Sequence, residues 1–180
     1  MPAQSKNFLA KFSLLPAAII VFSAATAQAS DVADVARRFS LPTPVVETVI
    51  RNIDSFFAST EAPDNRMTSG LIKELALKAV KTHMGHLDEE GPGKASESSA
   101  DEKNATYKVS LRTTRHEATE TAECVDASAT VTGSEGVPVI KDGAFTFDSV
   151  HPKTSSYSWK MTFCRTPLNG GSDFTDWQLR

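Results

Sequence analysis

The spacing of apolar residues changes once along this 180-residue chain, and that change constrains the fold more than any other feature. Across residues 43–87 the apolar side chains recur every three or four positions, which is the period of a helix that buries one face. After residue 105 they recur at every second position, which is the period of a strand with one buried face. The sequence therefore predicts a helical segment over residues 30–87 and a β segment over residues 105–180.

Three stretches of the helical segment are expected to form helices. The first covers residues 31–39 and stops before a segment that contains two prolines. The second starts at Thr43, whose hydroxyl and following Pro44 suit a first helical turn, and ends near residue 58. The third starts near residue 69 and is expected to end close to Gly85, because glycine disfavours a helix interior. Two or three N-terminal helices with apolar stripes are thus available to cover a sheet.

The β segment contains five or six alternating stretches that are joined by turns. The Lys141-Asp142-Gly143 triplet predicts a hairpin between two of them, and the glycine-containing stretch 133–138 reads as a further turn. Strands that follow one another without intervening helices form an antiparallel sheet. The predicted fold class is therefore α+β, with two or three N-terminal helices packed on a five- to six-stranded antiparallel sheet.

This order of elements resembles the cystatin-like and NTF2-like folds, in which helices precede a curved sheet. The resemblance covers element order alone and implies no activity, because folds of this kind host both enzymes and binding proteins.

Residues 88–104 contain no large apolar side chain and are rich in Gly, Ser and charged residues. Such a composition does not bury enough apolar surface to offset the entropy of ordering the chain. The sequence predicts a flexible linker here, between a helical segment and a β segment that pack together as one domain.

The N-terminus has the pattern of a secretory signal peptide. Lys6 and Lys11 precede an apolar run over residues 12–22, and small residues follow up to Ala29. The apolar run is well short of the roughly 20 residues that span a bilayer. Residues 1–29 are therefore expected to be a signal peptide that is cleaved after Ala29, which gives a periplasmic or extracellular protein with no membrane span after cleavage.

The charge balance argues against nucleic acid as a partner. Removal of residues 1–29 leaves 17 Lys and Arg against 22 Asp and Glu, a net charge of −5. Proteins that bind phosphate backbones need clustered basic residues to release counterions. The basic residues of this chain are scattered among acidic ones.

The two cysteines, Cys124 and Cys164, alternate with the apolar residues of their own stretches, so both are expected on the sheet face that points away from the core. If their strands are neighbours, they are close enough for a disulfide. In an exported protein with two cysteines, one bridge is the simplest interpretation. The alternative is a reactive Cys124 with His116 or His151 as its base.

His83 and His86 lie three residues apart near the end of the third helix and share one helix face. With a neighbouring carboxylate they are a candidate divalent-metal site. The alternative is structural, because both histidines extend the apolar stripe of the helix. A second candidate surface is the outward face of the sheet, where Lys108, Arg112, His116 and Lys160 are expected near the bridge as a weakly basic binding surface.

No zincin, serine-elbow, P-loop or dinucleotide motif is present, and no cofactor is expected. We therefore expect a small exported protein that acts by binding an unidentified protein or envelope component. The alternatives are a small periplasmic hydrolase with a pocket between helices and sheet, and divalent-metal binding at His83 and His86. A pocket that collects His116, Glu117 or His151 would favour the hydrolase.

Overall fold

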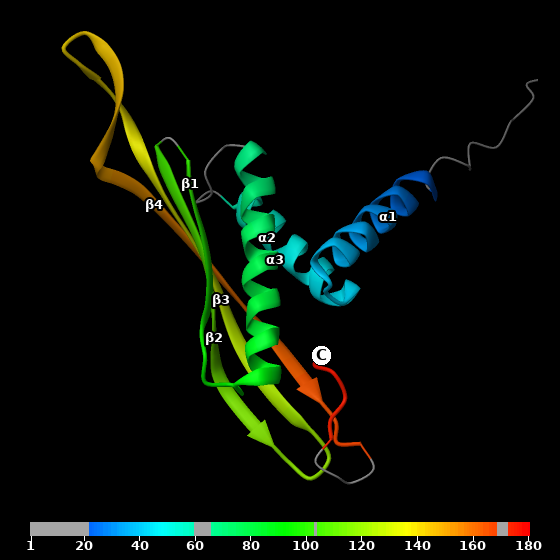
Figure 1. Ribbon diagram of the computed structural model, residues 1–180. Helices are drawn as coiled ribbons and strands as arrows, with labels where there is room; N and C mark the ends of the chain where they lie inside the picture. Colours follow the sequence, from blue (N-terminus) through cyan, green and yellow to red (C-terminus); the bar gives the residue numbers. More distant parts are fainter. Residues whose placement is uncertain (1–21, 60–65, 103, 169–172) are drawn as a thin grey trace, which may run out of the picture.

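The computed structural model describes residues 22–59, 66–102, 104–168 and 173–180. Three helices precede five strands, and their bounds are α1 Phe22–Phe39, α2 Thr43–Ala58, α3 Arg66–Glu89, β1 Ser96–Glu102, β2 Ala105–Ala118, β3 Glu123–Lys141, β4 Ala144–Arg165 and β5 Gln178–Leu179. The strands form one antiparallel sheet in chain order. Figure 1 shows the helices on one side of this curled sheet, so the predicted α+β class is confirmed.

The helices match the predicted ones, with differences at their ends. Helix α2 spans the predicted residues, but its N-cap is Pro42 and no side chain caps it, so the capping role expected for Thr43 is wrong. Helix α3 does not end near Gly85 and continues to Glu89. Leu87 beyond the glycine is buried, and its packing compensates for the low helix propensity of glycine.

Helix α1 covers the predicted residues 31–39 and extends upstream across Ala29. Most of the predicted signal peptide, residues 1–21, lies outside the described residues. The cleavage site therefore stays a prediction.

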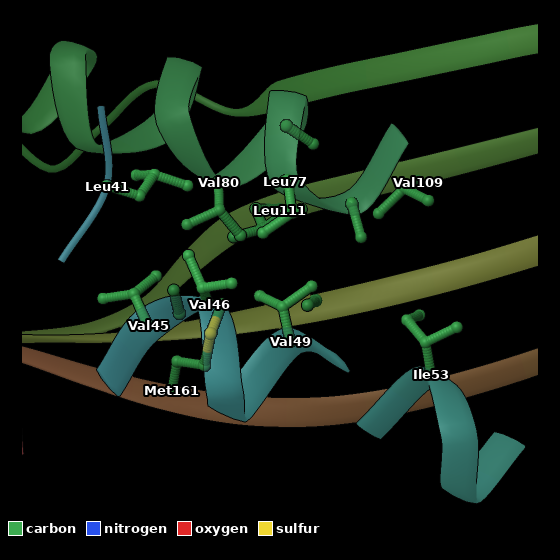
Figure 2. Packing of buried hydrophobic residues seen from close by; sticks show 14 of the residues in the cluster. Leu41, Val45, Val46, Val49, Ile53, Leu77, Val80, Val109, Leu111 and Met161 are labelled. Carbon is green, nitrogen blue, oxygen red and sulfur yellow. The ribbon is translucent and has the colours of Figure 1, made fainter. Parts of the chain in front are cut away.

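One apolar core joins the helices to the inner face of the sheet, the face that points towards α2 and α3. Figure 2 shows side chains from α2, α3, β2 and β4 converging in this cluster. Helix α3 lies over β1 and β2. Helix α2 contacts α3 and reaches β4, where Phe56 stacks on Tyr157 with ring centroids 5.7 Å apart. Large side chains on the inner face of the sheet, such as Phe163, are buried beneath the helices.

Strand β1 lies inside the predicted flexible linker, so that prediction is wrong for residues 96–102. The strand pairs with β2 along its whole length. Its inward positions from Ser96 to Ala100 carry only small side chains, and the buried Ser96 hydroxyl donates a hydrogen bond of 2.8 Å to the carbonyl oxygen of Ala79 in α3. Backbone pairing and a close helix therefore order a segment that has no large apolar residue.

Strands β3 and β4 are the two longest strands, and each is continuous. The stretch 133–138, expected as a turn, is part of β3 and contains only a register shift between Glu135 and Val137. Opposite this shift β4 bends, because residues 149–152 have no register partners in β3. Beyond the bend, the two strands project past β1, β2 and the helices (Figure 1).

We call residues 137–150 the β3–β4 arm. Its two-residue turn is Asp142-Gly143, with φ of 53° and 77°. Positive φ at both positions is typical of the type I′ turn that suits a twisted hairpin. The hairpin predicted from the Asp-Gly pair is confirmed.

Candidate functional site

Cys124 and Cys164 form the predicted disulfide. They are direct register partners on β3 and β4, with Cα atoms 4.1 Å apart. Both are out of phase with the buried Val125 and Phe163, so the bridge lies on the outer face of the sheet as expected. Because Cys124 is bonded, it is not a free thiol nucleophile.

The outer face of the sheet carries three of the four predicted surface residues. Arg112, Ser128 and Lys160 form one row across β2, β3 and β4. Lys108 lies further along β2, and its Nζ is 2.5 Å from Glu97 Oε2 on β1. Hydroxyl side chains occupy most of the positions between these cations, and the charge of Lys108 is balanced locally.

His116 is not on this face, so its assignment to the outward surface is wrong. A β-bulge between Thr113 and Arg115 shifts the register of β2, and His116 becomes the partner of Val125. Residues opposed in an antiparallel pair share a face, and Val125 is fully buried on the inner face. The bulge therefore turns His116 to the inner side, at the end of the sheet.

His116 belongs there to a cluster around Glu123. Its Nε2 is 2.8 Å from Glu123 Oε1, and Arg165 donates from Nε to Glu123 Oε2 at 2.7 Å. The guanidinium of Arg165 lies over the rings of Phe174 and Trp177, 4.4 and 4.6 Å from their centroids. Cation–π contacts of this kind join the C-terminal segment to the sheet. Each of these groups has its partner within the cluster, so the cluster serves to hold the C-terminal segment against the sheet.

Burial by itself raises the pKa of Glu123. The hydrogen bonds from Arg165 and His116 outweigh it, and the pKa lies below its ordinary value. Glu123 is therefore held as a carboxylate that pairs with Arg165, and not as a proton donor at neutral pH.

His83 and His86 occupy different environments. His83 is fully buried beside Phe163, with ring centroids 6.5 Å apart, and His86 is only partly buried. Burial, and then the nearby His86, lower the pKa of His83. Neither ring nitrogen of His83 has a hydrogen-bond partner among the described residues. Within that same part of the chain no three His, Cys, Asp or Glu side chains gather as metal ligands, so the metal site gains no support.

Two hollows lined by described residues differ from the predicted hydrolase pocket. A groove of about 860 Å³ lies between α1 and α2, lined by residues such as Val35, Ile50 and Arg51, and not between helices and sheet. A smaller hollow of about 370 Å³ lies on the outer face and is lined mostly by Ser and Thr. His116, Glu117 and His151 line neither of them.

Among the described residues, most of the exposed large apolar side chains lie on the β3–β4 arm. The large apolar side chains that are exposed there, with their exposed fractions, are Val137 38%, Ile140 79%, Phe145 70%, Phe147 40% and Val150 78%. In the rest of the described chain only Leu168 and Phe174 are comparable. Exposed apolar patches of this kind are typical of surfaces that contact another molecule, so the arm is a candidate contact surface.

The aromatic residues of the arm lie on one side, whereas Val137 pairs with Asp148 and lies on the other. Register pairs Ile140 with Phe145 and Pro138 with Phe147, so these four side chains share a face. The two phenylalanine rings meet edge to face, with centroids 5.4 Å apart. The sequence shows the alternation in both strands, but alternation alone does not tell whether a helix covers the apolar side. That is why this surface was missed.

Among the described residues, no helix has the length and apolar character needed to cross a membrane. Comparison with known protein families, with curated proteins and with solved structures finds no match for this chain.

Proposed function

We propose that this chain is an exported binding protein, and that it contacts a protein partner through the apolar side of the β3–β4 arm. The observation that carries the proposal is the exposure of Ile140 and Phe145, at 79% and 70%, on a hairpin that none of the described helices covers. Large apolar side chains cost free energy when they face water, and a partner that buries them recovers about 25 cal/mol per Å². Aromatic side chains are also enriched in the energetic centres of protein interfaces.

The compartment is part of the proposal. A disulfide such as Cys124–Cys164 persists in oxidising compartments and is rare in the cytosol. The leader-like residues 1–29 agree with export, and the acidic balance of the remaining chain disfavours nucleic acid. Together these features favour a protein of the periplasm or the cell exterior.

The described residues give the hydrolase alternative no comparable support. Cys124 is bonded to Cys164, and His116 is held by Glu123 within an anchoring cluster. His151 is exposed on the bend of β4, with Nδ1 3.2 Å from Asp148 Oδ2.

Site-specific photocrosslinking tests the proposal. A benzoyl-phenylalanine placed at Phe145 should give adducts in intact cells, because that side chain lies at the centre of the proposed contact. The matched control is the same probe at Ser158, which is exposed on the outer face of β4. Adducts at Phe145 and not at Ser158 support the proposal, and equal labelling of both positions, or none at Phe145, refutes it.

A further inference from the structure

We infer that the partner of the β3–β4 arm is a second copy of this chain, joined by antiparallel pairing of β4 with β4 of the other copy around a two-fold axis at Thr146. This inference rests on the proposed function of the arm and names its occupant.

The first step is the open edge of β4. Among the described residues, β5 covers that edge only at Phe163 and Cys164, so the stretch within the arm has a strand on one side only. An exposed edge offers unpaired N–H and C=O groups to another strand. Strand addition of this kind is a common mode of recognition.

The backbone groups of the arm point in known directions. Lys141 and Ala144 flank the two-residue turn and therefore form a hydrogen-bonded pair. Pairs alternate along the ladder, so Phe145 and Phe147 direct their N–H and C=O groups to the open edge of β4. On the open edge of β3, the opposite residue Pro138 has no N–H to offer. The open edge of β4 therefore keeps all its N–H donors, whereas the open edge of β3 lacks the one at Pro138.

The regular part of that edge is symmetric about Thr146. It begins after Gly143 of the turn and ends at Asp148, before the unpaired residues 149–152. These five residues, 144–148, pair completely with a second copy only when Thr146 lies on the two-fold axis. In that register Phe145 faces Phe147 of the second copy, and both present outward backbone groups.

The same register is favourable for the side chains. The phenylalanines of both copies share one face and make cross-strand aromatic pairs, which stabilise antiparallel sheets. Ala144 faces Asp148 of the second copy, so no like charges are opposed. The pairing covers the open backbone edge of both arms and the flanks of Phe145 and Phe147 that adjoin it, while Ile140 on β3 stays at the outer side of the joined sheet. The arm projects past the helices (Figure 1). The helices of two copies would therefore not hold the two β4 edges apart.

The charge of the arm does not favour a lipid surface. Lys141 is adjacent to Asp142, and Asp148 also lies in the arm, so there is no cluster of basic residues. Binding to anionic membranes by such a segment requires clustered Lys and Arg.

Cysteine crosslinking tests the register. Across the two-fold axis, Thr146 faces its own copy as a non-hydrogen-bonded pair, with Cα atoms expected about 4.5 Å apart. This separation suits a disulfide, so Thr146→Cys should form a covalent dimer under mild oxidation. The matched control is Ala144→Cys on the same face, because the two copies of residue 144 would be about 14 Å apart. Sedimentation equilibrium should show a wild-type dimer that Phe145→Ser weakens at least about tenfold.

Equal crosslinking of Thr146→Cys and Ala144→Cys, or a wild-type protein that stays monomeric up to its solubility limit, overturns the inference. A monomeric protein whose probe at Phe145 labels a different protein would leave the proposed function standing and remove the second copy. A probe at Phe145 that labels nothing would refute both.

Discussion

Glu123 and Arg165 are direct partners on β3 and β4, and Arg165 Nε donates to Glu123 Oε2 at 2.7 Å at the end of the sheet. The side chains are only 13% and 22% exposed, so solvent weakens this ion pair less than it weakens those on the surface. The rings of Phe174 and Trp177 pack on the same guanidinium. Arg165 therefore links β3, β4 and the C-terminal segment at this end of the sheet.

Glu123→Gln should lower the free energy of unfolding at pH 7 by about 1–2 kcal/mol, because Arg165 loses its charged acceptor. The pKa of Glu123 is below its ordinary value of 4.5, so its stabilisation is complete above pH 4.5 and is lost as the pH falls through the lower folded pKa. The variant should lack this part of the acid sensitivity. Urea unfolding from pH 7 to pH 3 measures both effects.

The control for that variant is Glu117→Gln, because Glu117 and its partner Arg115 are mostly exposed. Its effect should stay within about 0.5 kcal/mol. A Glu123→Gln protein with the stability and pH profile of the wild type would contradict the role of the ion pair.

Removal of the disulfide should lower the free energy of unfolding more than Glu123→Gln does. The bridge closes a loop with a sequence separation of 40 residues, for which the chain-entropy model gives about 4 kcal/mol. The double variant Cys124→Ala, Cys164→Ala should lose about this much free energy of unfolding, as measured in urea. Reductant should destabilise the wild type and leave the double variant unchanged. Equal stability of reduced and oxidised wild type would show that the bridge does not stabilise the fold.

The sequence predicted the elements that depend on local pattern. The helices follow from apolar spacing, the disulfide from the phase of Cys124 and Cys164, and the hairpin from Asp142-Gly143. Strand β1 was missed because its order comes from backbone pairing and from contact with α3, including the Ser96 hydrogen bond, and not from apolar side chains.

The surface was harder to predict because a shift of one residue moves a side chain to the other face. The bulge after Thr113 has no clear signature in the sequence, yet it places His116 on the inner face. The exposed side of the arm depends in turn on how far the helices reach along the sheet. Alternation in the strands carries no information on that distance.

Phe145 and Phe163 should differ sharply when they are truncated. Phe163 is fully buried in the core and Phe145 is 70% exposed on the arm. Phe163→Ala should lose about 3–5 kcal/mol of unfolding free energy, whereas Phe145→Ser should change it by less than about 0.5 kcal/mol. Guanidinium unfolding at low protein concentration measures both without a contribution from association. A loss of several kcal/mol for Phe145→Ser would show that the arm is part of the core and not a contact surface.

His83 should make the protein acid-sensitive at pH values where carboxylates do not yet titrate. Burial lowers the pKa of His83 below its ordinary 6.5, so the unfolded chain takes up a proton at a higher pH than the folded one. Stability is therefore complete above pH 6.5 and falls as the pH drops towards the lower folded pKa. His83→Leu should remove this dependence, so that its free energy of unfolding relative to wild type rises between pH 7 and pH 5. Thr82→Ala, a change at the exposed neighbouring position of α3 that carries no titratable group, is the control and should leave the slope unchanged. Parallel pH profiles for His83→Leu and wild type would show that the folded protein accommodates a charged His83.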